Sequence, residues 1–158
     1  LCDTFKDTID INQQDDYGYT TLMIAAQYNT NIEVMQYLCK TFKDTIDISK
    51  QDNDGSAALM TMVQCETGEK VARCLCDTFK DTIDINMVDK YGYTALIVAV
   101  QDNTNIKMIQ YLCDTFKDTI DINKPDNKGM TPLMHAARYN PNAKIIQYLF
   151  DALLARDD

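Results

Sequence analysis

Apolar residues recur along this chain at spacings of three and four, and short polar stretches separate the runs. In residues 20–28 these spacings place Leu22, Ala25 and Ala26 on one face of a predicted helix. A second run, at roughly residues 31–42, repeats the spacing and predicts a second helix after a short polar loop. The small alanines of the first helix allow other elements to pack closely against it.

The residues around these two helices carry turn and capping signals. Gly18 closes an Asp-Asp-Tyr-Gly turn sequence, because glycine readily adopts the positive φ of a tight turn. Thr20 then suits the N-cap of the first helix. After the second helix, Ile46 and Ile48 flank Asp47, an alternation that predicts a short extended segment. One unit is therefore a turn, two helices and an extended return.

This unit recurs with a period of 37 residues. The turn glycine is found at Gly18, Gly55, Gly92 and Gly129, and a leucine in the same register at Leu1, Leu38, Leu75, Leu112 and Leu149. A unit of this size cannot bury its own apolar face, so neighbouring copies must cover one another in an elongated solenoid. We expect a single domain over residues 1–158, with a partial repeat at 1–12 and repeats at 13–49, 50–86, 87–123 and 124–158.

One copy carries a motif of high specificity. Residues 126–137 read Asp-Asn-Lys-Gly-Met-Thr-Pro-Leu-Met-His-Ala-Ala, which resembles the ankyrin signature Asp-x-x-Gly-x-Thr-Pro-Leu-His-x-Ala-Ala. Residues 20–26 and 94–100 are looser versions, and Asp-Ile-Asn at 10–12 is similar to the family's closing Asp-Val-Asn. The resemblance covers essentially the whole chain. It implies an all-α ankyrin-like solenoid of helix-turn-helix repeats with short turn or hairpin projections.

The copies depart from the ankyrin pattern in length and at one signature position. They are 37 residues long, against about 33 in most of the family. The excess falls in the loop between the helices and in residues 41–45. Met23, Met60, Ile97 and Met134 replace the signature histidine, so we expect apolar packing in place of that histidine's hydrogen bonds.

Charge and hydropathy restrict the classes of partner. The formal net charge is -9 and the pI is about 4.5, which opposes binding to nucleic acid and to anionic lipid. No apolar run reaches the roughly 20 residues that span a membrane. A cysteine follows the repeated leucine in four copies, at Cys2, Cys39, Cys76 and Cys113. Such cysteines are typical of small core residues in a reduced protein. We therefore expect a soluble, intracellular and cytoplasmic protein.

The side chains able to support catalysis or bind metal are few. His135 is the single histidine, and we expect it to be a helix residue that is half-buried or faces a neighbour. Cys65, Cys74 and Cys76 could suggest a zinc site, but residues two apart on a helix point away from each other and a fourth ligand is lacking. We expect no enzymatic activity, no cofactor and no metal.

The ankyrin resemblance implies that the turn tips and the exposed side of each first helix form a concave surface that contacts another protein. The corresponding residues are Tyr17, Tyr19, Gln27 and Tyr28, then Asp54, Ser56, Gln64 and Cys65, then Tyr91, Tyr93, Gln101 and Asp102, and finally Lys128, Met130, Arg138 and Tyr139. Tyrosines are good anchors because they offer large area with few rotatable bonds. The acidic charge favours a basic partner.

A second functional class stays open. The last predicted helix is unusually apolar, with Phe150, Leu153 and Leu154 near its end. Repeats that are uncovered at their ends can associate end to end. The alternative is therefore a structural scaffold or spring, a segment of a longer array that is a monomer or self-associates weakly.

Overall fold

The computed structural model describes residues 9–29, 31–64, 68–102 and 105–156. Its helices are α1 (Thr21–Tyr28), α2 (Ile32–Thr41), α3 (Ala58–Gln64), α4 (Glu69–Phe79), α5 (Ala95–Asp102), α6 (Ile106–Thr115), α7 (Pro132–Tyr139) and α8 (Ala143–Leu154). These described ranges contain no strand, and their β pairing is an isolated bridge between Gln51 and Ala57. The all-α, helix-turn-helix prediction is confirmed.

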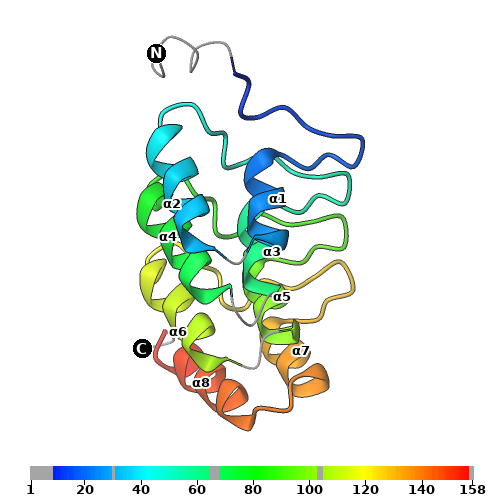
Figure 1. Cartoon of the computed structure of the whole chain (residues 1–158). Coiled ribbons are helices and arrows are strands. Elements are labelled where there is room, and N and C mark those ends of the chain that lie inside the picture. The colour runs from blue at the N-terminus through cyan, green and yellow to red at the C-terminus, as the bar shows by residue number, and fades with distance from the viewer. Residues whose placement is uncertain (1–8, 30, 65–67, 103–104, 157–158) are drawn as a thin grey trace.

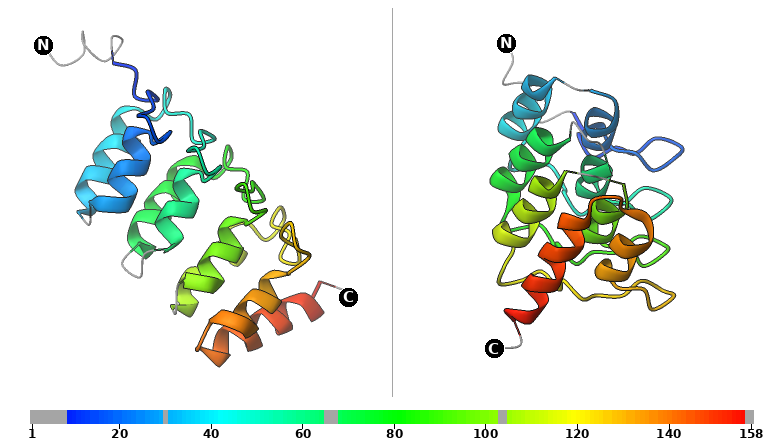
Figure 2. Two further views of the ribbon diagram at one scale, coloured as in Figure 1. Left: turned by 90° about the vertical axis from the view of Figure 1, so that its right-hand side faces the viewer. Right: turned by 90° about the horizontal axis from the view of Figure 1, so that it is seen from below.

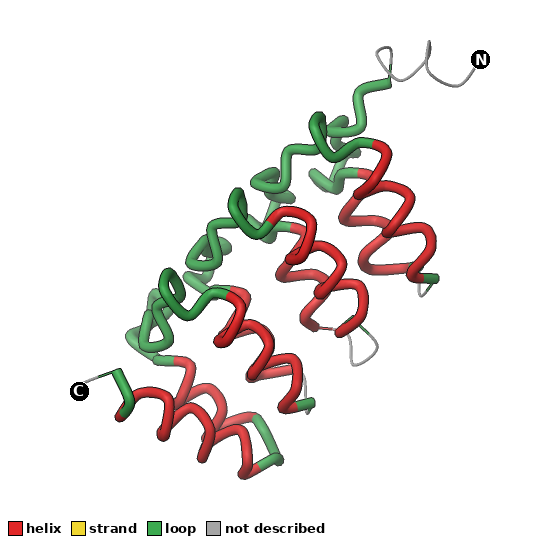
Figure 3. The backbone as a smooth tube through the Cα atoms, turned by 90° about the vertical axis from the view of Figure 1, so that its left-hand side faces the viewer, coloured by secondary structure: helices red, strands yellow, loops and turns green. Residues whose placement is uncertain are grey.

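The helices stand in two columns (Figure 1). Helices α1, α3, α5 and α7, which we call the inner helices, form one column, and the outer helices α2, α4, α6 and α8 form the other. Figure 2 shows each helix pair stacked on the next, with the first and last pairs at opposite ends. The loops that join successive pairs all gather along one edge of the stack (Figure 3). The loops and the exposed sides of the inner helices therefore face a common space.

The core is continuous because each helix pair covers the next. Met23, Met60 and Ile97 are buried where the signature histidine would stand, which confirms the predicted apolar environment at these three positions. The Met23 sulfur nevertheless accepts a hydrogen bond from the Thr20 backbone N–H at 3.4 Å. Met134 occupies the same repeat position, yet 54% of its surface is exposed. The prediction is wrong there because α7 belongs to the last described pair and no further pair covers it.

Local capping starts the helices where the sequence indicates. The Thr20 hydroxyl accepts a hydrogen bond from the Met23 backbone N–H at 3.3 Å and caps α1, as predicted. Each outer helix of the first, third and fourth pairs begins after an asparagine, namely Asn31, Asn105 and Asn142. These side chains satisfy backbone donors that an isolated helix end would leave unpaired. Helix α2 ends against Phe42, which also agrees with the prediction.

The return segment differs from the sequence prediction. A short extended segment was expected around Ile46 and Ile48, but residues 43–45 and 48–49 form turns. The Phe42 carbonyl accepts from the Thr45 and Ile46 backbone N–H groups at 3.0 and 2.8 Å. Both isoleucines are half-buried and pack against the core. Their alternation therefore records contact with the core and not the pairing of a strand.

Asparagine side chains tie successive return segments together. Asn12 Nδ2 donates to the Thr45 carbonyl at 2.7 Å, and its Oδ1 accepts from the Asp47 backbone N–H at 2.7 Å. Asn86 makes the same two bonds two junctions further on, to Thr119 and Asp121, at 2.7 and 2.8 Å. Between them the sequence has Ser49, which instead bonds within its own turn to Asp47. A serine side chain is too short to span to the next return.

Replacing Ser49 with asparagine should therefore stabilise the protein. The backbone around Ser49 matches that around Asn12, because each N–H donates at 3.0 Å to the aspartate two residues before it. The new amide should reach the Thr82 carbonyl and the Asp84 N–H, adding about 1 kcal/mol to the free energy of unfolding. Chemical denaturation measures this gain. Ser49→Asp is the matched control, since a carboxylate cannot donate to Thr82, and an equal gain in both variants would contradict the tie.

Candidate protein-binding surface

The loop tips between helix pairs share one hydrogen-bonding scheme. An aspartate at the start of each tip accepts, through Oδ1, from the backbone N–H groups two and four residues later at 2.8–2.9 Å. The aspartates are Asp15, Asp52, Asp89 and Asp126. Because the scheme uses only backbone donors, the side chains at those later positions are left to project from the tip.

Neighbouring tips are also bonded to one another. The Asn53 backbone N–H donates to the Tyr17 carbonyl at 3.0 Å, and the Asn127 N–H donates to the Tyr91 carbonyl at 3.1 Å. Between these, the Lys90 N–H donates to the Asp54 carbonyl at 2.9 Å. The tips therefore form a connected row and hold their projecting side chains at fixed spacings.

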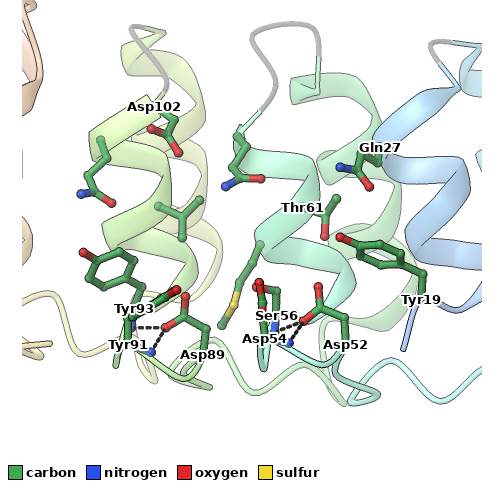
Figure 4. Close-up of a pocket in the computed structure, with 14 residues that line it drawn as sticks. Tyr19, Gln27, Asp52, Asp54, Ser56, Thr61, Asp89, Tyr91, Tyr93 and Asp102 are labelled. Carbon is green, nitrogen blue, oxygen red and sulfur yellow. Dashed lines mark hydrogen bonds between the residues drawn. The ribbon is translucent and has the colours of Figure 1, made fainter. Parts of the chain in front are cut away.

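A hollow of about 270 Å³ lies between this row and the inner helices α1, α3 and α5 (Figure 4). Tyr19 and Tyr93 stand at its two ends, and Asp102 lies on the side away from the tips. Its lining is Tyr19, Gln27, Asp52, Asp54, Ser56, Met60, Thr61, Gln64, Asp89, Tyr91, Tyr93, Val98, Gln101 and Asp102. The hollow thus combines aromatic ends with carboxylates contributed by two tips and one helix.

The carboxylates dominate the electrostatics of the hollow. Partial burial, followed by the negative charge of Asp52, raises the pKa of the Tyr19 hydroxyl. Partial burial also raises the pKa of Asp102, although a hydrogen bond from Gln64 opposes the shift. Lys90 pairs with Asp54 at 2.5 Å and lies 5.0 Å from the centre of the Tyr91 ring. Such a site favours positively charged groups.

The structure brings only part of the sequence-predicted surface to this hollow. Its lining includes Tyr19, Gln27, Asp54, Ser56, Gln64, Tyr91, Tyr93, Gln101 and Asp102. Tyr17 and Tyr28 are exposed but do not line it, and Cys65 lies outside the described residues. Sequence reasoning missed Asp52 and Asp89, which it treated as turn signals. Their recurrence at the same place as the projecting tyrosines was the available clue.

The residues predicted in the fourth repeat form a separate group. Arg138 lies 5.1 Å from the ring centre of Tyr139 and contacts the Met130 sulfur at 3.8 Å. Lys128 is exposed on the adjoining tip. This group is basic and aromatic, so the surface changes character from the acidic hollow to the last repeat.

His135 is more deeply placed than the half-buried position considered from the sequence. Its side chain is 1% exposed, and Nε2 lies 3.0 Å from Asp126 Oδ2. The ring packs edge-on to Tyr93 and stacks on Tyr139, with centroid distances of 5.2 and 5.9 Å. The histidine occupies the repeat position of Ile24 and Val98, and its contact with Tyr93 joins it to the preceding repeat. Its role is to hold Asp126 and the last tip.

The zinc candidate of Cys65, Cys74 and Cys76 falls partly outside the described residues, because Cys65 lies in a gap. No group of three or more histidine, cysteine, aspartate or glutamate side chains in the described part of the chain could hold a metal ion. Cys74 is half-buried and Cys76 is buried, and both are free thiols. None of the helices in the described ranges has the length and hydrophobicity that crossing a bilayer requires.

Stacked helix pairs with a row of bonded loop tips define a helical repeat protein. A family model described as ankyrin repeats (3 copies) matches residues 1–89 and 71–156, and the chain belongs to the ankyrin repeat family. Ankyrin repeats are generally protein–protein interaction modules, and the family is generally non-catalytic. A comparison with curated proteins found no match.

Proposed function

We propose that this chain is a non-catalytic interaction module that binds a basic segment of another protein at the hollow between Tyr19 and Tyr93. The supporting observation is the composition of that hollow. Asp52, Asp54 and Asp89 line it together with the two tyrosines. A lysine or arginine side chain presents a cation on an apolar stem, which matches carboxylates and aromatic faces at once.

Tyr19→Ala and Tyr93→Ala should each weaken partner binding by about 1–2 kcal/mol, or roughly 5- to 30-fold, because tyrosines are frequent interface anchors. The test begins with capture from a matched extract, followed by calorimetry with the purified partner. Tyr37→Ala is the matched control, since Tyr37 is 62% exposed and belongs to the outer helix α2.

Equal affinities for all three variants would remove the hollow from the binding surface. Binding that does not weaken as salt rises would contradict a basic partner, since attraction between exposed charges is screened by ions. The two outcomes therefore separate the location of the site from the charge of the partner.

The scaffold alternative also has a specific observation in its favour. Met134, Phe150 and Leu154 are 54%, 49% and 53% exposed on the last described pair, and Ile24 is 39% exposed on the first. Apolar side chains at both ends of a stack would suit end-to-end association of copies. Light scattering over a concentration series distinguishes a monomer from such a stack.

A further inference from the structure

The surface positions that line the acidic hollow recur in the fourth repeat with different residues. Lys128 stands at the repeat position of Asp54, and Arg138 stands at the repeat position of Gln64 and Gln101. Those three residues of the earlier repeats all line the hollow. Helix α7, which carries Arg138, lies next to α5 in the inner column (Figure 1). The fourth repeat therefore continues the face of the molecule in which the hollow lies.

A chain of ring contacts joins the hollow to the basic residues of the fourth repeat. Tyr93, at one end of the hollow (Figure 4), packs edge-on to His135 with a centroid distance of 5.2 Å. His135 stacks on Tyr139 at 5.9 Å, and the Arg138 guanidinium lies 5.1 Å from the centre of the Tyr139 ring. Tyr139 is 48% exposed. Tyr139 and Arg138 are thus the surface neighbours of the hollow on its Tyr93 side.

The charge of this face reverses at the fourth tip. Asp52 and Asp89 are half-buried and line the hollow. The equivalent Asp126 is held inside the protein, with a side chain that is 2% exposed. Lys128 and Arg138 are exposed, and within the described ranges no carboxylate forms an ion pair with either of them. The fourth repeat therefore withdraws its tip carboxylate from the surface and presents two cations.

We propose that the partner segment is bipolar, with its basic residue in the hollow and an acidic residue bound between Lys128 and Arg138. This placement rests on the proposed function, which puts the basic residue in the hollow. A lysine and an arginine together suit a carboxylate, and the guanidinium can bind it bidentately. Packed helices lie about 8–10 Å apart and an extended chain advances about 3.3 Å per residue, so a distance of one to two repeats separates the charges by about three to six residues.

The test uses the full chain and two fluorescent synthetic peptides. The bipolar peptide has an arginine pair, a Gly-Ser spacer of about four residues and an aspartate pair. The comparison peptide has asparagines in place of the aspartates. Anisotropy titrations at about 0.15 M salt, where charges more than about 8 Å apart are largely screened, measure both affinities. The chain should bind the bipolar peptide about three- to tenfold more tightly than the comparison peptide.

A double substitution locates the acidic end of the peptide. Lys128→Asp with Arg138→Gln introduces residues that the second repeat already has at these positions, Asp54 among them, so the fold should be kept. This variant should lose the preference for the bipolar peptide or reverse it. Lys144→Asp with Lys40→Gln is the matched control, because it makes the same change in net charge at exposed positions of the outer helices α8 and α2. The control should keep the preference of the parent.

Tyr19→Ala separates failure of the bipolar partner from failure of the proposed function. Tyr19 lies at the end of the hollow away from Tyr93, so its loss should weaken the binding of both peptides and leave the ratio of their affinities unchanged. Equal affinities of the parent for the two peptides, or a preference that survives the double substitution, would overturn the bipolar partner while the hollow remains a basic site. If neither peptide binds, or if Tyr19→Ala weakens neither, the proposed function fails as well.

Discussion

Replacing Gly92 with alanine is expected to lower the free energy of unfolding by about 3 kcal/mol. Gly92 has a φ of 84°, which costs an alanine about 1 kcal/mol. An added Cβ would also lie 2.6 Å from the Asn127 backbone nitrogen, on the neighbouring tip. Relieving that overlap must displace a tip that is bonded to Tyr91, at a further cost of about 1–3 kcal/mol.

Gly129→Ala is the matched control for this prediction. Gly129 has a φ of 80°, and an added Cβ would meet nothing within 4 Å. Gly129→Ala should therefore lower the free energy of unfolding by only about 1 kcal/mol, the cost of a positive φ for alanine. Chemical denaturation of both variants gives the difference directly. Equal losses of unfolding free energy in the two variants would show that the overlap of the added Cβ with the neighbouring tip has no energetic cost.

Asp126→Ala is expected to cost about 3 kcal/mol of unfolding free energy. Asp126 accepts from the Lys128 and Met130 backbone N–H groups and holds His135 Nε2, at 2.8, 2.9 and 3.0 Å. His135 Nδ1 is already buried without a partner. Removing the carboxylate would leave a second nitrogen of the same buried ring unsatisfied, together with two backbone donors.

Asp89→Ala separates the histidine contribution from the tip contribution. Asp89 accepts the same two backbone bonds, both at 2.8 Å, but the residue at the position of His135 is Val98. Removing the Asp89 carboxylate should therefore lower the free energy of unfolding by only about 1–2 kcal/mol. If the two variants are equally stable, the buried pair has no net stabilising effect.

The stability difference caused by Asp126 should also depend on pH. Burial alone would raise the pKa of Asp126, but the Met130 and Lys128 N–H groups and His135 outweigh burial and lower it. The folded state therefore binds this proton more weakly than the unfolded chain. The stabilisation is present above about pH 4 and is lost as pH falls through the lower folded pKa. The gap between parent and Asp126→Ala should narrow there in denaturation experiments, and a gap that widened would contradict this scheme.

The sequence predicted those features that depend on local spacing. Leu22, Ala25 and Ala26 specify a helix by themselves, and Thr20 and Phe42 lie at helix ends because caps depend on nearby residues. The period of 37 residues then fixed the stacking, since identical units bury identical faces. The positions of the helices and their caps therefore do not depend on contacts with distant residues.

Features set by contacts between unlike repeat positions were not predictable in the same way. Ile46 and Ile48 alternate like a strand, but their partners are core side chains of other segments. The hollow likewise required the distance between tips, which brings Asp52 and Asp89 beside Tyr19 and Tyr93.

The aspartate scheme of the loop tips separates shape from recognition. Each tip is folded by a carboxylate and backbone N–H groups, while the side chains at the two donor positions are Tyr17 and Tyr19 in one tip and Lys128 and Met130 in another. Point substitutions at these positions can therefore change the surface proposed for binding without new loop conformations. Under the proposed function, a change of partner would then require as few as two altered residues per tip, with the backbone unchanged.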